Sequence, residues 1–262
     1  RRQRQMCIRD SPYTILITED DDEVRGFLER ELSLHFKIRT VANGKDALRV
    51  LEEEEISLVV SDVMMPEMNG FELCRTIKSQ LPFSHISVIL LTALTDERQR
   101  IFGITGGADD YIQKPFHTDY VKIKIIHLLQ ERQKLRERLL EKLRDNKLLL
   151  SEPEKVESID DTFLRKFAEQ IEAVYADPEY NVEKLSETLG LSRGHLHRKI
   201  KELTGTAPVE FLRTYRLNKA TQLLRQNAYT VSEVAYRTGF SSPAYFSKCF
   251  KAVYGVTPTE YQ

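Results

Sequence analysis

Acidic, hydroxyl and cationic residues follow four short apolar runs in the first half of the chain. Glu19 and Asp20 follow TILIT, and Asp62 follows LVVS. Thr92 ends SVILLT, and Lys114 follows DYIQ. Carboxylates that gather in one place repel one another and raise at least one pKa unless a cation lies among them. Mg²⁺ suits such a place because it binds a few carboxylate oxygens, keeps several waters and accepts phosphate oxygens.

These residues meet only if the apolar runs are neighbouring parallel strands. TILIT (14–18), LVVS (58–61) and SVILLT (87–92) are apolar almost throughout, as strands covered on both faces are. FKIRTV and DYIQ predict two shorter strands, and the segments between them carry apolar residues at helical spacing. The pattern predicts a doubly wound α/β domain with a five-stranded parallel sheet, which binds its ligands where the strands end.

At that edge Thr92 would offer a hydroxyl to an incoming oxyanion, and Lys114 a positive charge. Pro115 makes a cis peptide affordable after Lys114. Each residue also has an ordinary explanation: Asp62 as a helix cap, Thr92 as a strand residue, Lys114 as a surface charge. Their placement at successive strand ends favours a site. The choice of Glu19 and Asp20 within TEDDDE depends on the strand ending at Thr18.

The second half contains an internal repeat. NVEKLSETLGLSRGHLHRKIKELTGTAPVEF (181–211) recurs as TVSEVAYRTGFSSPAYFSKCFKAVYGVTPTEY (230–261), with one residue gained midway. The positions in register include Gly190 and Gly239, Ser192 and Ser241, and Pro208 and Pro258. Each copy has the pattern of a helix, a turn, a serine cap and a second helix, which predicts an all-α domain with two helix-turn-helix units.

Charge and composition separate the two halves. Residues 12–118 hold 11 Lys and Arg against 19 Asp and Glu, whereas residues 181–262 hold 12 against 6, so the basic half suits phosphates. Cys7, Cys74 and Cys249 are too widely spaced for a disulfide framework or a zinc pattern. The longest apolar run, 88–94, is far shorter than the roughly 20 residues of a membrane span. We expect a cytoplasmic chain that makes no membrane contact of its own, tethered to the inner membrane only if it is fused to a membrane protein.

Four regions are predicted. Residues 1–11 contain MCIRDS, which resembles a translated transposon end, and they are excluded as a non-native tail; an ordinary disordered start is the alternative. Residues 12–129 form the α/β domain, 130–160 a helical linker, and 161–262 the helix-turn-helix domain. The last helix of the α/β domain is expected to continue into the linker, where a weak heptad seam suggests dimerisation and a solvated helical linker is the equal alternative. The leucines of the seam are Leu128, Leu135, Leu139 and Leu149.

ILITEDD, SDVMMPEMNG, ILLTA and GADDYIQKPF resemble the motifs of the receiver domain of bacterial two-component response regulators, over about residues 13–129. The resemblance implies a flavodoxin-like sheet and a phosphoryl group accepted by Asp62 from a phosphohistidine. It implies a switch in the face made by the fourth helix, fifth strand and fifth helix. The other site residues that it implies are the Mg²⁺ ligands Asp20, Asp62 and the backbone carbonyl of Met64, Glu19 acting through water, the switch pair Thr92 and Tyr111, and the phosphoryl-binding Lys114.

The repeat resembles the AraC-type DNA-binding domain, over about residues 161–262. The resemblance implies recognition helices at 192–204 and 242–254, joined by a helix from Pro208 to about Arg225. At 1.5 Å per residue that helix is roughly 27 Å long, enough to hold two helices in successive major grooves. The implied DNA-binding residues are Arg193 and Lys199 near phosphates, Gly194, His197 and Arg198 at base-facing positions, and Pro243, Ala244, Ser247 and Lys248 in the second unit.

Two of these positions carry further expectations. Arg198 is the strongest candidate for a bidentate contact to guanine. Gly194 departs from the family pattern, because glycine has no side chain to read a base.

The order of the domains resembles the tail of hybrid systems that fuse a sensor kinase to its regulator, and a freestanding regulator is the close alternative. The partners expected are promoter DNA, a histidine kinase in trans or fused upstream, RNA polymerase, and a second copy bound through the receiver and linker helix. No enzyme is expected within this chain. An interaction or phosphorelay receiver with constitutive DNA binding is a further alternative, while a phosphatase is disfavoured because Met64 stands where a second acid is needed.

Overall fold

The computed structural model describes residues 13–93, 107–144 and 158–262, and the chain divides into two compact units, Arg1–Lys134 and Leu135–Gln262. The predicted tail, 1–11, lies outside the described residues. In the first unit five parallel strands form one sheet in the order β2-β1-β3-β4-β5. The strands are β1 (Thr14–Thr18), β2 (Lys37–Val41), β3 (Leu58–Asp62), β4 (Ser87–Thr92) and β5 (Asp110–Gln113). The doubly wound fold predicted from the sequence is confirmed.

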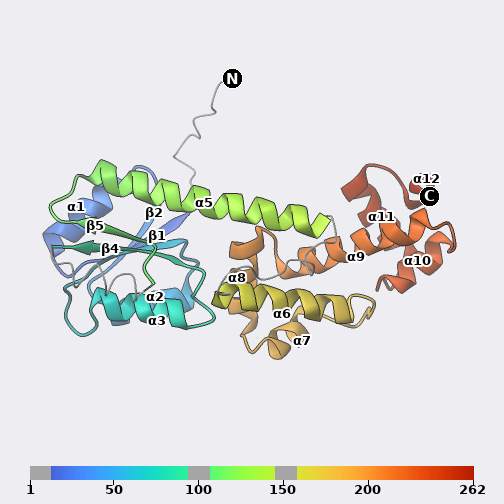
Figure 1. The fold of residues 1–262 in the computed structure, drawn as a ribbon, viewed down its shortest axis with the longest axis horizontal. Coiled ribbons are helices and arrows are strands. Elements are labelled where there is room, and N and C mark those ends of the chain that lie inside the picture. The colour runs from blue at the N-terminus through green and yellow to red at the C-terminus, as the bar shows by residue number, and fades with distance from the viewer. Residues whose placement is uncertain (1–12, 94–106, 145–157) are drawn as a thin grey trace, which may run out of the picture. The chain divides into compact units, whose positions relative to one another are not determined.

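Helices cover both faces of the sheet (Figure 1). On one face α1 (Asp22–Ser33) and the first part of α5 (Thr118–Arg144) bury Leu28, Val121 and Ile125 against Ile15, Ile17 and Ile89. On the other face α2 (Gly44–Glu53) and α3 (Gly70–Ser79) bury Ala47, Leu51, Leu73 and Ile77 against Leu16, Val59 and Leu90. The central strands β1, β3 and β4 are apolar over most of their length because both of their faces are covered, whereas the edge strands β2 and β5 are more polar.

The helix α5 has 27 residues and begins at Thr118. Leu129 is buried against the sheet, whereas Leu135 is 50% exposed. The side chains of Leu139 and Leu149 lie outside the described part of the chain, so the heptad seam stays a prediction. Among the described helices, none combines the length and apolar character that a bilayer crossing requires.

Among the described residues of the second unit the regular elements are all helices, joined by turns and loops. Its helices are α6 (Ile159–Val174), α7 (Val182–Thr188), α8 (Arg193–Thr204), α9 (Pro208–Arg225), α10 (Val231–Arg237), α11 (Pro243–Tyr254) and α12 (Pro258–Tyr261). The pairs α7–α8 and α10–α11 are the two predicted helix-turn-helix units. Leu196 and Ile200 of α8 are buried in the first helix-turn-helix unit, and Phe246 and Phe250 of α11 are buried in the second.

The repeat in the sequence is a repeat of turn geometry. Gly190 and Gly239 have φ of 68° and 78° in the two turns, and Gly205 and Gly255 have φ of 76° and 78° after the recognition helices. Left-handed backbone of this kind favours glycine. The caps are Ser192 and Ser242, whereas the sequence register pairs Ser192 with Ser241, so the gained residue lies in the second turn.

Candidate functional site

Three carboxylates meet where β1 and β3 end. The strand β1 stops at Thr18 and places Glu19, which is 1% exposed, beside the end of β3, where Asp62 is 7% exposed. Asp20 is exposed at the mouth of the site. One carboxylate oxygen from each of Glu19, Asp20 and Asp62 lies within 4.8 Å of the others.

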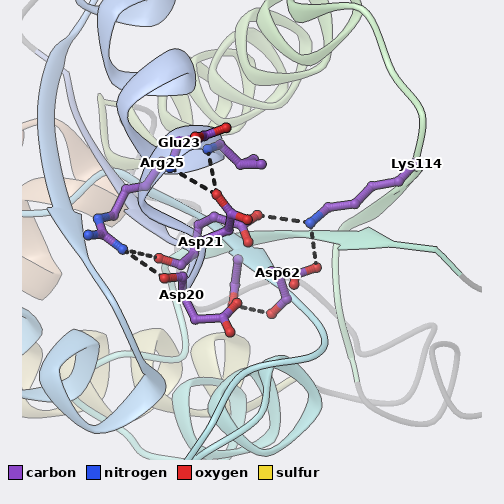
Figure 2. Close-up of polar contacts among 9 residues, drawn as sticks. Asp20, Asp21, Glu23, Arg25, Asp62 and Lys114 are labelled. Carbon is purple, nitrogen blue, oxygen red and sulfur yellow. Dashed lines mark hydrogen bonds and ion pairs between the residues drawn. The ribbon is translucent and has the colours of Figure 1, made fainter.

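Lys114 bridges the two buried acids of this cluster. Its Nζ lies 2.9 Å from Glu19 Oε2 and 3.0 Å from Asp62 Oδ1. Figure 2 shows its side chain extending from the segment after β5 toward Asp62. The Lys114–Pro115 peptide is cis. Side chains at the ends of β1, β3 and β5 therefore meet at one edge of the sheet.

The electrostatics follow from this crowding. Burial, and to a smaller extent the charge of Asp62, raises the pKa of the Glu19 carboxyl, although the hydrogen bond from Lys114 opposes the rise. Burial disfavours the charged form of Lys114, but its hydrogen bonds and attraction to Glu19 and Asp62 raise its pKa above the ordinary value. A buried excess of negative charge is the condition in which a divalent cation binds well.

The five acids of TEDDDE make different contacts. Asp21 is the N-cap of α1 and accepts hydrogen bonds from the backbone N–H of Glu23 and Val24 at 2.9 and 3.0 Å. Those bonds lower the pKa of Asp21. Because Asp21 is engaged in capping, Glu19 and Asp20 are left for the site, as the end of the strand at Thr18 predicts.

Arg25 of α1 holds the backbone of this segment, and the sequence analysis missed it. Figure 2 shows the Arg25 side chain reaching back to the segment that contains Asp20. Its Nη1 donates to the carbonyls of Glu19 and Asp20 at 2.7 and 3.3 Å, and its Nη2 pairs with Asp22. The signal that the sequence offers is an arginine five residues after Asp20, on the first turn of the following helix.

Gly70 packs directly on the backbone of Asp62, and this contact was also missed. A Cβ at Gly70 would lie 2.2 Å from the Asp62 carbonyl oxygen, and the Gly70 N–H donates to Val63 O at 3.0 Å. Farther along the loop Glu67 has φ of 63°, and Met68 O accepts from the N–H of Gly44 at 3.3 Å. The backbone of the β3–α3 loop therefore packs against Gly44 and Gly70.

The remaining predicted receiver residues lie around this centre. Thr92 ends β4 and is partly buried. Tyr111 lies on β5 and packs against the core cluster that contains Leu90 and Cys74, where burial raises its pKa to about 12. Met64 has an exposed side chain, and the role of its backbone carbonyl stays a prediction. The fourth helix of the expected switch face falls in 94–106, outside the described residues.

The donor set fits the predicted metal. Three carboxylates within reach of one another supply hard oxygen ligands, and one exposed member leaves room for waters and a phosphate oxygen. Lys114 is already placed beside two of these oxygens, so an incoming anion would meet a cation on that side as well. Receiver acids arranged in this way are typical of a Mg²⁺ site.

In the second unit the predicted DNA-binding residues lie on the starts of α8 and α11. Arg193, Gly194 and His197 are exposed, and Arg198 is partly buried. In the second helix Ala244 and Lys248 are exposed, while Pro243 and Ser247 are partly exposed. Arg193 also pairs with Glu183 at 2.7 Å. These positions are compatible with a role at DNA, which stays a prediction.

Lys199 is a correction. It was expected near phosphates, but its side chain is 0% exposed and its Nζ lies 2.5 Å from Asp160 Oδ1 of α6. It also lies 5.1 Å from the ring centroid of Phe163. A fully buried and paired ammonium cannot contact the backbone of DNA, so Lys199 joins α6 to α8 instead.

Two family models match the chain. Residues 15–126 match the response regulator receiver domain, and residues 185–262 match a helix-turn-helix domain. The chain is 39% identical over 249 residues to "Histidine kinase P4" of Formosa agariphila, which covers 95% of this chain and 18% of that protein. It is 43% identical over 121 residues to "Transcriptional regulatory protein GltR" of Pseudomonas aeruginosa, covering 46% of this chain and 50% of that protein.

A solved signal receiver domain of a signal transduction histidine kinase from Syntrophus aciditrophicus is 38% identical, with a TM-score of 0.44, and covers 45% of this chain and 91% of that one. The chain spans half or less of the two curated relatives named above. The receiver match contains the Glu19, Asp20, Asp62 and Lys114 cluster, and the second match contains both recognition helices. This chain is therefore a response regulator receiver domain followed by an AraC-type helix-turn-helix domain.

Proposed function

We propose that the chain is a phosphorylation-dependent transcription regulator in which Asp62 accepts a phosphoryl group from a phosphohistidine of a partner kinase. The observation that carries this proposal is the contact of Lys114 Nζ with Asp62 Oδ1 at 3.0 Å inside a cluster of three carboxylates. A chain that joins such a site to two helix-turn-helix units has one domain that could receive the phosphoryl group and another that could bind DNA in response.

In the proposed transfer an oxygen of Asp62 attacks phosphorus, and the bond from phosphorus to the histidine nitrogen breaks. The nitrogen leaves with the electron pair. Bound Mg²⁺, held by Asp20 and Asp62 with the Met64 carbonyl and with Glu19 through water, would neutralise charge on the phosphoryl oxygens. Lys114 lies where it can bind another of these oxygens, and Thr92 would bind a third.

The added phosphoryl charge would then draw Thr92 inward and shift Tyr111, which changes the face formed by β5 and α5. The ring of Tyr111 is already partly buried in this structure. The proposed change is therefore a repositioning of a half-buried ring.

The DNA-binding role is proposed for the two recognition helices with Arg193, Gly194, His197, Arg198, Pro243, Ala244, Ser247 and Lys248. Promoter DNA, RNA polymerase and a histidine kinase are the proposed partners, and dimerisation through the receiver and α5 is a further proposal. The likeness to "Histidine kinase P4" over 95% of this chain supports the reading that the chain is the regulator end of a hybrid kinase. Recovery of the upstream reading frame tests that part.

The test of the switch is Asp62→Asn in cells, with promoter occupancy and transcription measured together. We expect the variant to lose the signal-dependent change in both. Glu53→Gln is the matched control, because Glu53 is an exposed acid of the same unit that ends α2, on the sheet face opposite α5. If Asp62→Asn leaves occupancy and transcription unchanged, the receiver is an interaction or phosphorelay module and DNA binding is constitutive.

A further inference from the structure

A pocket of about 280 Å³ lies between the two helix-turn-helix units. Its lining includes Arg193, the first residue of α8, and Tyr245, on the first turn of α11. The connecting helix α9 contributes Arg213 and Arg216. The beginnings of both recognition helices therefore open onto one hollow.

The pocket carries an excess of positive charge. Arg193, Arg213 and Arg216 are its cations, and Glu183 is its one acid. Arg193 and Glu183 form an ion pair at 2.7 Å, with side chains 73% and 51% exposed. Exposed pairs of this kind contribute little and exchange readily with another anion. The lining therefore contains two more cations than acids, which favours the entry of an anion.

The hydrogen-bonding groups of the pocket are partly committed and partly open. Arg216 is committed, because it donates to the carbonyls of Tyr175 and Asp177 at 2.7 and 2.6 Å. Arg213 donates to the Tyr245 hydroxyl and pairs with Glu210 at 3.2 Å, with its side chain 39% exposed. The Tyr180 hydroxyl is buried without a hydrogen-bond partner among the described residues, and Tyr180 also lines the pocket.

The position of the pocket decides which anion it meets. Recognition helices enter the major groove with their N-terminal residues toward the bases, and two such helices occupy grooves one turn apart. The DNA between those grooves presents its minor groove and the phosphates that border it. A hollow between the two helix starts therefore faces backbone, which carries phosphodiester charges and no base edges of the major groove.

We propose that this pocket binds a DNA phosphate in the segment between the two major grooves, with Arg213 and Arg193 as the charged contacts and the Tyr245 hydroxyl as a donor. The proposal rests on the DNA-binding role proposed above. The contact would be independent of sequence and would fix the register of the two recognition helices on the duplex. None of these contacts except Arg193 was predicted from the sequence.

Salt dependence provides the test, because each phosphate contact contributes about 0.9 to the slope of log K against log salt. Duplexes of 40 base pairs enriched by the wild-type chain from a random pool serve as probes. Arg213→Gln should reduce the slope by about 0.9 and weaken binding about tenfold, by a similar factor on every duplex. Arg213→Lys should keep the slope. Arg165→Gln is the control, since Arg165 is an exposed arginine of α6 that does not line the pocket.

A second measurement separates contact from structure. Neutral methylphosphonates are placed one at a time along the segment between the two sites. Wild type should lose affinity at one or two positions, and Arg213→Gln should show no further loss there. An unchanged slope in Arg213→Gln, or a methylphosphonate effect of equal size in wild type and variant, overturns the proposal. A third result also overturns the proposal: inorganic phosphate binds the DNA-free chain, but Arg213→Gln leaves the salt slope unchanged. The pocket would then be an anion site that does not contact DNA. If wild type binds no duplex at all, the proposed DNA-binding function fails instead.

Discussion

Replacing Gly70 with alanine should damage phosphotransfer without touching any group that contacts phosphate. The new Cβ would lie 2.2 Å from Asp62 O and 3.0 Å from Val63 Cα, whereas ordinary contacts begin at 3.4 Å. The start of α3 and the backbone of Asp62 must therefore separate by roughly 1 Å, because both of these groups are backbone and neither can rotate away. The same movement strains the hydrogen bond from Gly70 N–H to Val63 O.

Two magnitudes follow from this separation. Overpacking by one methyl costs about 1–3 kcal/mol, and a weakened backbone hydrogen bond adds about 1 kcal/mol, so the free energy of unfolding should fall by about 2–4 kcal/mol. A displacement of about 1 Å in a reacting group lowers the rate on the order of 100-fold. Asp62 is that group, and Lys114 Nζ lies 3.0 Å from it before the change.

The assay is the mass gained by the full chain at Asp62, measured over time with acetyl phosphate and MgCl₂, together with a thermal melt. Gly26→Ala is the control, because a Cβ at Gly26 has nothing within 4 Å and the residue lies inside α1. It should raise stability by about 0.5–1 kcal/mol and leave the rate unchanged. A Gly70→Ala chain that gains phosphate as fast as wild type would refute the link between this packing and the chemistry.

Other perturbations test the charges and turns. Burial raises the pKa of Glu19 above its ordinary value of 4.5, so its stabilising contribution is complete below pH 4.5 and is lost as pH rises through the folded pKa. In Mg²⁺-free buffer the melting temperature of Glu19→Gln should therefore rise relative to wild type as pH increases from 4.5 to 7, and a difference that does not vary with pH would contradict this. Lys199→Ala should lower the free energy of unfolding by about 3–5 kcal/mol, because it removes the buried cation that lies 2.5 Å from the Asp160 carboxylate, with no change in the salt slope of DNA binding. Gly239→Ala should cost about 2–4 kcal/mol, because its Cβ would lie 2.1 Å from Tyr175 O at φ of 78°. Gly190→Ala, at φ of 68° with nothing within 4 Å, should cost only about 1–2 kcal/mol, and equal losses in the two melts would contradict the packing argument.

The strands were predictable because their signal is local. TILIT and SVILLT match β1 and β4 residue for residue, since a strand covered on both faces is apolar over most of its length. DYIQ matches β5, a short and more polar strand at the edge of the sheet. The predicted LVVS stops one residue short of β3, which includes Asp62, and FKIRTV begins one residue before β2. Strand ends in turn placed Glu19, Asp62 and Lys114 at one edge. The cluster therefore followed from the sequence through the fold.

The contacts that the sequence did not predict join residues that no local pattern relates. Lys199 stands beside base-facing positions on its helix, and only the packing of α6 shows that Asp160 receives it. Gly70 stands at a helix start, where glycine is unremarkable, and only the path of β3 explains why a side chain is excluded. Helical periodicity assigns faces to residues but says nothing of which distant element covers a face.

The contacts of α5 indicate how a conformational change that begins at Asp62 could be transmitted from the sheet to this helix. Arg132 donates to Ser57 O and Ser87 Oγ at 3.0 Å each, at the beginnings of β3 and β4. Lys124 pairs with Asp110 at the beginning of β5 at 2.8 Å. The helix is thus fixed to the ends of three strands opposite the ends that carry Asp62, Thr92 and Lys114. Since strands are stiff along their length, we infer that a shift of these strands in the proposed switch would move the part of α5 that carries Lys124 and Arg132.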